Sequence, residues 1–94
     1  MGRATSEVKH PYVRRVRGIC GGEPVIAGTR FTVRAVVEYA YHQGMSAEEM
    51  AHEWPHLTLS QIHDALSYYH DHKDLIDRLI HENRESVARK RADT

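Results

Sequence analysis

The sequence predicts a mainly α, single-domain protein with an N-terminal β-ribbon, a trihelical helix-turn-helix core and a long C-terminal amphipathic helix. Its length of 94 residues suits one domain. The glycine-rich string 21–30 surrounds a short apolar run, Val25-Ile26, which is typical of a turn, a short strand and a second turn. Two capping boxes follow, beginning at Ser46 and Thr58, and they predict two short helices joined by a turn.

The segment before the helices predicts a flexible terminus and a weak ribbon. Residues 1–11 are polar, and we expect them to be flexible. Residues 12–17 and 24–27 predict two short strands. Because two isolated strands expose unpaired edges, we expect a homodimer that is completed through this ribbon. The ribbon and helix-turn-helix then form a domain over 12–70, and residues 71–94 form the C-terminal helix with its basic tail.

Apolar residues at three- and four-residue spacing predict the helices. The first helix ends near Gly44 and has an apolar face made of Val33, Val36, Val37 and Ala40. The second begins at Ser46 and ends before Pro55, and its Met50, Ala51 and Trp54 side chains are expected to face the core. The third buries Leu59, Ile62, Ala65, Leu66 and Tyr69. The fourth runs from Asp71 or Lys73 to about Arg89 with a face made of Leu75, Ile76, Leu79, Ile80 and Val87.

Charges are segregated along the chain although the net charge is zero. Residues 1–35 contain seven basic and two acidic side chains, whereas residues 36–83 contain two basic and nine acidic ones. Residues 84–94 are basic again, with four Lys or Arg against two acids. This asymmetry indicates a basic arm and an acidic body with different partners, and the alternative is a merely solvated surface.

A helix-turn-helix presents its second helix, here residues 59–69, to the major groove of DNA. We expect Ser60, Gln61, His63, Asp64 and Ser67 to be exposed on it. Because this helix has no Lys or Arg, phosphate contacts must come from elsewhere. The predicted DNA-binding residues are Arg14, Arg15, Arg17, Arg30 and Arg34 for phosphates and Gln61, His63 and Ser67 for base edges. Two alternatives remain: Arg30 pairs with an acid such as Glu38 or Glu53, or the motif serves only as a dimerisation body.

No catalytic or metal site is predicted. His52 and Glu53 begin a literal His-Glu-x-x-His string that ends at His56, but Pro55 ends the helix that zinc chemistry needs. Incidental metal binding by His63 and His70, seven residues apart, is the alternative to exposed surface histidines. The single Cys20 has no evident base. Without a signal peptide or an apolar run of membrane-spanning length, a cytoplasmic location is expected, with no membrane partner and no cofactor.

The chain resembles a bacterial and archaeal family, the domain of unknown function 433. The matching residues are Gly21-Gly22-Glu23-Pro24-Val25-Ile26, Gly28-Thr29-Arg30, Gly44, Ser46-Ala47-Glu48-Glu49, Trp54-Pro55, Leu57-Thr58 and the Ile62, Ala65, Leu66 stripe. The similarity covers about residues 12–70. Members resemble small helix-turn-helix proteins, many of them regarded as VapB-type antitoxins encoded beside a PIN-like ribonuclease toxin. The resemblance implies toxin neutralisation together with autoregulatory binding of operator DNA by a dimer.

Residues 71–94 lie beyond the resemblance and predict a toxin-binding segment. PIN-type nucleases hold Mg²⁺ with acidic residues, and a basic peptide over that cluster would block it. The candidates are Leu75, Ile76, Leu79 and Ile80 for an apolar groove and Arg84, Arg89, Lys90 and Arg91 for the acidic cluster. The alternative is a core-packing helix with a frayed basic tail. A stand-alone helix-turn-helix transcriptional regulator, or a dimeric scaffold without a toxin, is the alternative function, and an enzyme is not expected.

Overall fold

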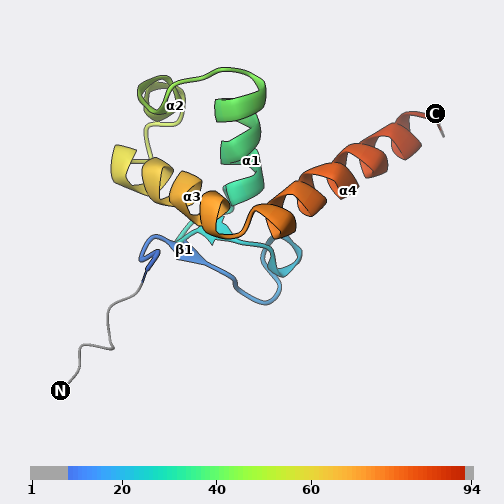
Figure 1. Ribbon diagram of the computed structural model, residues 1–94, viewed down its shortest axis with the longest axis horizontal. Coiled ribbons are helices and arrows are strands. Elements are labelled where there is room, and N and C mark those ends of the chain that lie inside the picture. The colour runs from blue at the N-terminus through green and yellow to red at the C-terminus, as the bar shows by residue number, and fades with distance from the viewer. Residues whose placement is uncertain (1–8, 93–94) are drawn as a thin grey trace.

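A two-stranded ribbon lies against a group of helices, from which one long helix projects (Figure 1). The computed structural model describes residues 9–92. The elements are, in order, β1 (Val13–Arg14), the 3₁₀ turn η2 (Cys20–Gly22), β2 (Val25–Ile26), α1 (Val33–Val37), the π-helical turn η3 (Glu38–His42), α2 (Ala47–Glu53), α3 (Leu59–Asp71) and α4 (Lys73–Ala92). The predicted fold class is confirmed.

The ribbon is antiparallel and shorter than the predicted strands. Val13 lies opposite Ile26, and Arg14 lies opposite Val25. The first strand ends at Arg14 because the chain turns away, as the Ile19 N–H donates to the Val16 carbonyl. β1 lies at the outer side of the ribbon, since β2 also pairs through an isolated bridge between Val25 and Thr32.

The glycine-rich string forms two turns around β2, as predicted. Gly22 and Gly28 have φ values of 80° and 79°, which other residues adopt only at a cost. After Gly28 the chain turns back, and the Ile26 N–H donates to the Phe31 carbonyl at 2.9 Å. The Thr32 side chain then accepts from the Ala35 N–H and caps α1. The string therefore delivers the chain from the ribbon directly into the first helix.

Both predicted capping boxes are present. Ser46 Oγ accepts from the Glu49 N–H at 3.0 Å, and Glu49 Oε1 accepts from the Ser46 N–H at 2.8 Å. The Thr58 and Gln61 pair repeats this arrangement at 3.1 and 2.8 Å. Gly44, with φ of 75°, follows η3 and lets the chain turn toward α2.

The core lies where α3 packs against α1, α2 and both strands. Its fully buried large side chains include Ile26, Val36, Met50, Ile62 and Ile76. The predicted burial of Leu59 is wrong, since this residue is 41% exposed. Leu59 is the first residue of α3, one turn before the buried stripe begins at Ile62.

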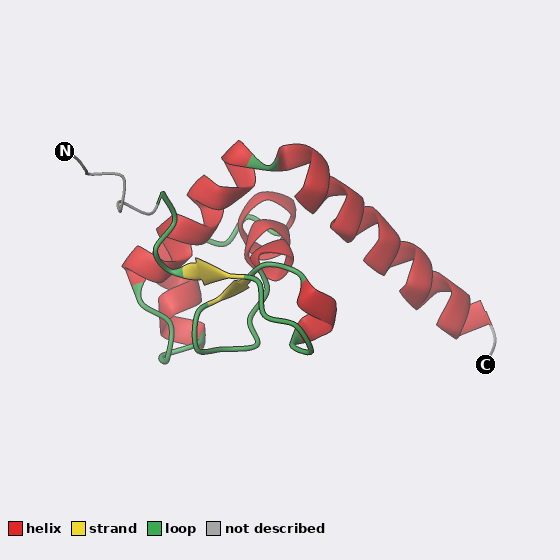
Figure 2. Cartoon of the chain, turned by 90° about the horizontal axis from the view of Figure 1, so that it is seen from below, coloured by secondary structure: helices red, strands yellow, loops and turns green. Residues whose placement is uncertain are grey.

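The helix α4 belongs to the body only along its first part. Ile76 and Ile80 lie in the core, and beyond Ile80 every described residue is exposed or half-buried. Figures 1 and 2 show the rest of the helix extending away from the other elements. The helix ends at Ala92, three residues later than predicted. Among the described residues, none of the helices is long and apolar enough to cross a membrane.

Candidate functional site

The exposed face of α3 is polar and carries no Lys or Arg. Ser60, His63 and Ser67 are exposed, and their spacing of three and four residues places them on one face. Gln61 is half-buried, and its side-chain oxygen is used by the capping box. Of the predicted base-contacting residues, His63 and Ser67 are thus exposed to solvent, whereas the side-chain oxygen of Gln61 already accepts a hydrogen bond from Thr58.

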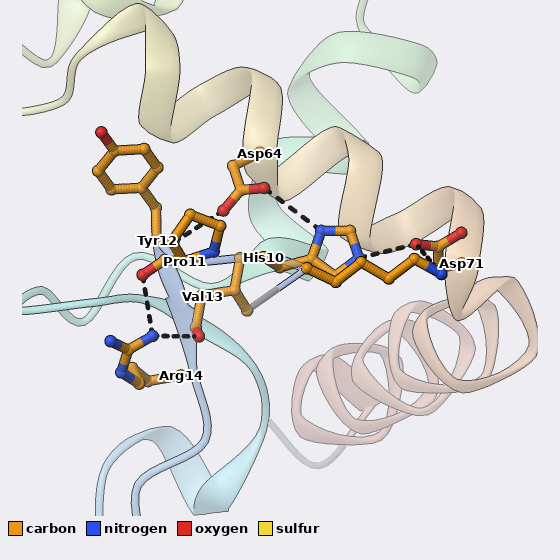
Figure 3. Close-up of polar contacts among 8 residues, drawn as sticks. His10, Pro11, Tyr12, Val13, Arg14, Asp64 and Asp71 are labelled. Carbon is orange, nitrogen blue, oxygen red and sulfur yellow. Dashed lines mark hydrogen bonds and ion pairs between the residues drawn. The ribbon is translucent and has the colours of Figure 1, made fainter. Parts of the chain in front are cut away.

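The neighbouring face of α3 is covered by the segment that precedes β1. His10 is 8% exposed and lies between two carboxylates of α3, as Figure 3 shows. Its Nε2 is 2.8 Å from Asp71 Oδ2, and its Nδ1 is 3.3 Å from Asp64 Oδ1. The backbone N–H of Tyr12 also donates to Asp64 Oδ2 at 2.8 Å. Residues 10–12 are therefore clamped onto α3.

The clamp corrects two predictions. The flexible N-terminus was expected to extend through residue 11, but His10 is buried, and residues 1–8 of that segment lie outside the described residues. Asp64 was expected to be exposed, yet its side chain is only 13% exposed because His10 and Tyr12 cover it. The Asp64 carboxylate is thus engaged within the chain.

Both ring nitrogens of His10 lie within hydrogen-bond distance of carboxylate oxygens of α3. The hydrogen bond from His10 lowers the pKa of the Asp71 carboxyl below its ordinary value of 3.8, and the Lys9 ammonium adds to the effect. The His10 ring also contacts the Tyr68 ring edge-on, with centroids 5.2 Å apart.

The five predicted phosphate-contacting arginines lie in different environments. Arg14 donates to the carbonyls of Pro11 and Val13, as Figure 3 shows, but its side chain remains exposed. Arg15 donates from Nε to the Gly22 carbonyl and is also exposed.

Arg34 is held in an ion pair, whereas Arg17 and Arg30 are exposed. Arg34 Nε is 3.1 Å from Glu23 Oε1, and this side chain is only 20% exposed. The suggested pairing of Arg30 with Glu38 or Glu53 is not found in the described part of the chain; Arg34 contacts Glu38 instead. Arg34 is therefore a structural residue in this conformation.

The predicted toxin-binding residues divide into a packed and a projecting group. Ile76 and Ile80 are 0% and 5% exposed in the domain's own core, and Leu75 and Leu79 pack against that core. These four do not form the open docking stripe that was expected, because they anchor α4 to the body.

The second group lies farther along α4. Arg84 Nη2 lies 3.2 Å from Glu38 Oε2, so this residue still touches the body. The remaining members, Arg89, Lys90 and Arg91, are exposed on the projecting part. Val87, which is 39% exposed, lies on the same part of the helix.

The predicted end of the His-Glu-x-x-His helix is confirmed. α2 ends at Glu53, Trp54 has non-helical angles, and His56 lies in the turn. No group of three or more His, Cys, Asp or Glu side chains within residues 9–92 is arranged to hold a metal ion. His70 instead contacts the hydroxyl of Tyr41 at 2.9 Å.

The sequence interpretation missed the clamp, although one signal for it exists. Asp64 and Asp71 are seven residues apart, which places both carboxylates on one face of a helix that has no Lys or Arg. Two aligned carboxylates of this kind can accept hydrogen bonds from another segment of the chain. His10, 54 and 61 residues away, contacts both of them.

Comparison with known proteins agrees with the fold. The family model described as protein of unknown function (DUF433) matches residues 13–69. A crystal structure of a DUF433 member protein from Anabaena variabilis ATCC 29413 is 33% identical, with a TM-score of 0.69. The match covers 73% of this chain and 67% of that one. No curated protein gives a match. The chain, with its glycine-rich ribbon and helix-turn-helix, belongs to the DUF433 family.

Proposed function

We propose that this chain is the antitoxin of a type II toxin–antitoxin pair. It binds and neutralises a PIN-like ribonuclease toxin with α4 and binds operator DNA as a homodimer. The observation that carries the proposal is the projecting part of α4, residues 81–92, which leaves the core after Ile80 and ends in Arg89-Lys90-Arg91. Residues 81–92 bury no side chain in the domain, so a partner that covers them would stabilise this part of the helix.

The chemistry of the projecting part suits an acidic partner. Its last turns present Arg89 and Lys90 to solvent beside the apolar Val87. A nuclease that holds Mg²⁺ with carboxylates offers a negatively charged cleft, and guanidinium groups bind carboxylates strongly. Because Ile76 and Ile80 are committed to the core, the toxin-binding surface is shifted to residues 84–92, with Leu75 and Leu79 at its edge.

We assign DNA binding to the exposed face of α3 and to the basic side chains of the N-terminal third of the chain. His63 and Ser67 on α3 would contact base edges, and Arg14, Arg15, Arg17 and Arg30 would contact phosphates. A dimer through the exposed edge of β1 would double this number of basic side chains and strengthen binding accordingly.

The test is co-expression with the product of the adjacent gene. We expect the full chain to co-purify with that protein and to relieve its growth arrest, whereas a truncation after Asn83 loses both effects and still folds. The triple variant Arg89→Glu, Lys90→Glu, Arg91→Glu should behave like the truncation. Arg17→Glu, a charge reversal on the ribbon side, is the matched control and should leave toxin inhibition intact. Failure of the full chain to bind or inhibit the neighbouring protein would overturn the proposal, and inhibition by the truncated chain would exclude the distal helix.

A further inference from the structure

A pocket of about 470 Å³ lies beside the glycine-rich turn, between η2, the start of α1 and the end of α2. This volume falls within the ~300–1,000 Å³ that is usual for small-molecule sites. The pocket is lined by three aromatic rings, an ion-paired arginine, an exposed arginine and the single cysteine. None of these side chains takes part in the His10 clamp or in the projecting part of α4.

The aromatic rings form one wall of the pocket. The Trp54 ring lies 4.7 Å from the Tyr39 ring and 5.0 Å from the Phe31 ring, measured between centroids. All three side chains are partly buried, so they hold one another in position and still reach the surface. The Trp54 ring is inclined by 48° to Tyr39 and by 68° to Phe31, and stacking of a planar ligand needs the face of only one ring.

The charges in the pocket favour an anion. The Glu23 carboxylate is matched by Arg34, whose Nε and Nη2 lie 3.1 and 3.4 Å from its two oxygens. Arg30 is exposed and forms no ion pair with the described residues. The lining residues therefore include one positive charge that no carboxylate of the pocket compensates.

The rim of the pocket has an unusual backbone. Cys20, with φ of 49°, is a non-glycine residue in the left-handed region, and Gly21 and Gly22 follow with positive φ. Strained residues of this kind gather at binding sites. The Cys20 thiol donates to the Arg30 carbonyl at 3.3 Å and so ties the turn to the residue that carries the uncompensated charge.

We propose that this pocket binds a nucleotide, with the base against the Trp54 wall and the phosphate at the Arg30 guanidinium. Aromatic rings stack on any base, and a guanidinium donates to phosphate oxygens in a bidentate manner. The same chemistry is offered by a free mononucleotide and by a nucleotide within a single strand. The proposal does not depend on toxin binding.

The pocket contains its own reporters, since Trp54 and Cys20 are the single tryptophan and the single cysteine of the chain. We would titrate AMP, UMP and an eight-nucleotide thymidine strand while recording tryptophan fluorescence, and measure the alkylation rate of Cys20 by iodoacetamide. We expect saturable quenching with at least one probe and slower alkylation at saturation. Arg30→Gln should weaken this binding about tenfold or more, because the variant cannot form the hydrogen bond between two charged groups.

Arg78→Gln is the matched control, because Arg78 is exposed on α4, does not line the pocket and belongs to no proposed binding surface. Its affinity should equal that of the unaltered chain, and circular dichroism should show both variants folded. Saturation by a mononucleotide supports the proposal with a free nucleotide as the ligand; saturation by the strand alone supports it with a single strand. The proposal is overturned if no probe gives saturable quenching or if the two arginine variants weaken binding equally.

Discussion

Nε2 of His10 lies 2.8 Å from Oδ2 of Asp71, although 61 residues separate the two in the chain. The second ring nitrogen contacts Asp64, which lies about two turns earlier on the same face of α3. The segment before the ribbon is thus fixed along the helix that the helix-turn-helix would present to DNA (Figure 3). This pair links the start of the described chain to the end of α3, where α4 begins.

Replacement of the clamp residue should destabilise the domain. His10→Ala removes hydrogen bonds to charged groups and leaves Asp64, which is largely buried, without its side-chain partner. We expect a decrease of about 1–3 kcal/mol in the free energy of unfolding, measured by urea denaturation at pH 6. His63→Ala, on the exposed face of the same helix, should change stability by less than about 0.5 kcal/mol. Equal decreases in the free energy of unfolding of the two variants would show that the clamp does not stabilise the domain.

The clamp should also make stability depend on pH in the acid range. The pKa of Asp71 is lower in the folded chain than its ordinary value of 3.8, so the folded state binds fewer protons there than the unfolded state. Its contribution is present above pH 3.8 and disappears as the pH falls through the lower folded value. The free energies of unfolding of the unaltered chain and of Asp71→Asn should therefore converge between pH 6 and pH 2. A constant difference across that range would contradict the assignment.

The second capping box should contribute measurably to the helix-turn-helix. Thr58→Ala removes the oxygen that accepts from the Gln61 N–H. We expect a decrease of about 1 kcal/mol in the free energy of unfolding, measured by thermal or urea denaturation. Ser60→Ala is the control, because Ser60 is an exposed residue inside the same helix. A Thr58→Ala variant as stable as Ser60→Ala would mean that solvent replaces the cap without cost.

The attachment of α4 should depend on its first part alone. Ile76→Ala creates a cavity at a fully buried position, which usually costs about 2–5 kcal/mol. Val87→Ala, on the projecting part, should change the free energy of unfolding by less than about 0.5 kcal/mol. Urea midpoints of the two variants give the comparison. A large decrease at Val87 would indicate that the distal helix packs on a second copy.

Local patterns made much of the fold predictable. Each capping box is complete within four residues, and the stripe of Ile62 and Ala65 needs only the helical period. Gly22, Gly28 and Gly44 fall at turns because their backbone angles disfavour other residues. These signals do not depend on which distant segments come together.

Interactions between distant segments account for what the sequence analysis missed. Nothing next to His10 distinguishes it from a solvent-exposed histidine, because its partners lie beyond residue 60. Likewise, the stripe containing Ile76 and Ile80 predicts an apolar face but not its partner: the same spacing suits a toxin groove or the chain's own core. The structure assigns these two residues to the core. The spacing of charges does not reveal that Arg34, rather than Arg30, reaches Glu38.

If the chain binds operator DNA, its exposed and its paired arginines should behave differently. Arg17→Gln should lower the affinity for duplex DNA from the upstream region and make the slope of log affinity against log salt shallower, by about one unit for each phosphate that the variant no longer neutralises. Its stability should not change, because the side chain is exposed. Arg34→Gln should instead lower the melting temperature, since Glu23 is deprived of the partner that lies 3.1 Å away. Fluorescence anisotropy at several salt concentrations, together with thermal unfolding, separates the two effects. If the affinity of Arg34→Gln for DNA depends less on salt than that of Arg17→Gln, Arg34 contacts a phosphate instead of Arg17. The ion pair between Arg34 and Glu23 would then have to open when DNA binds.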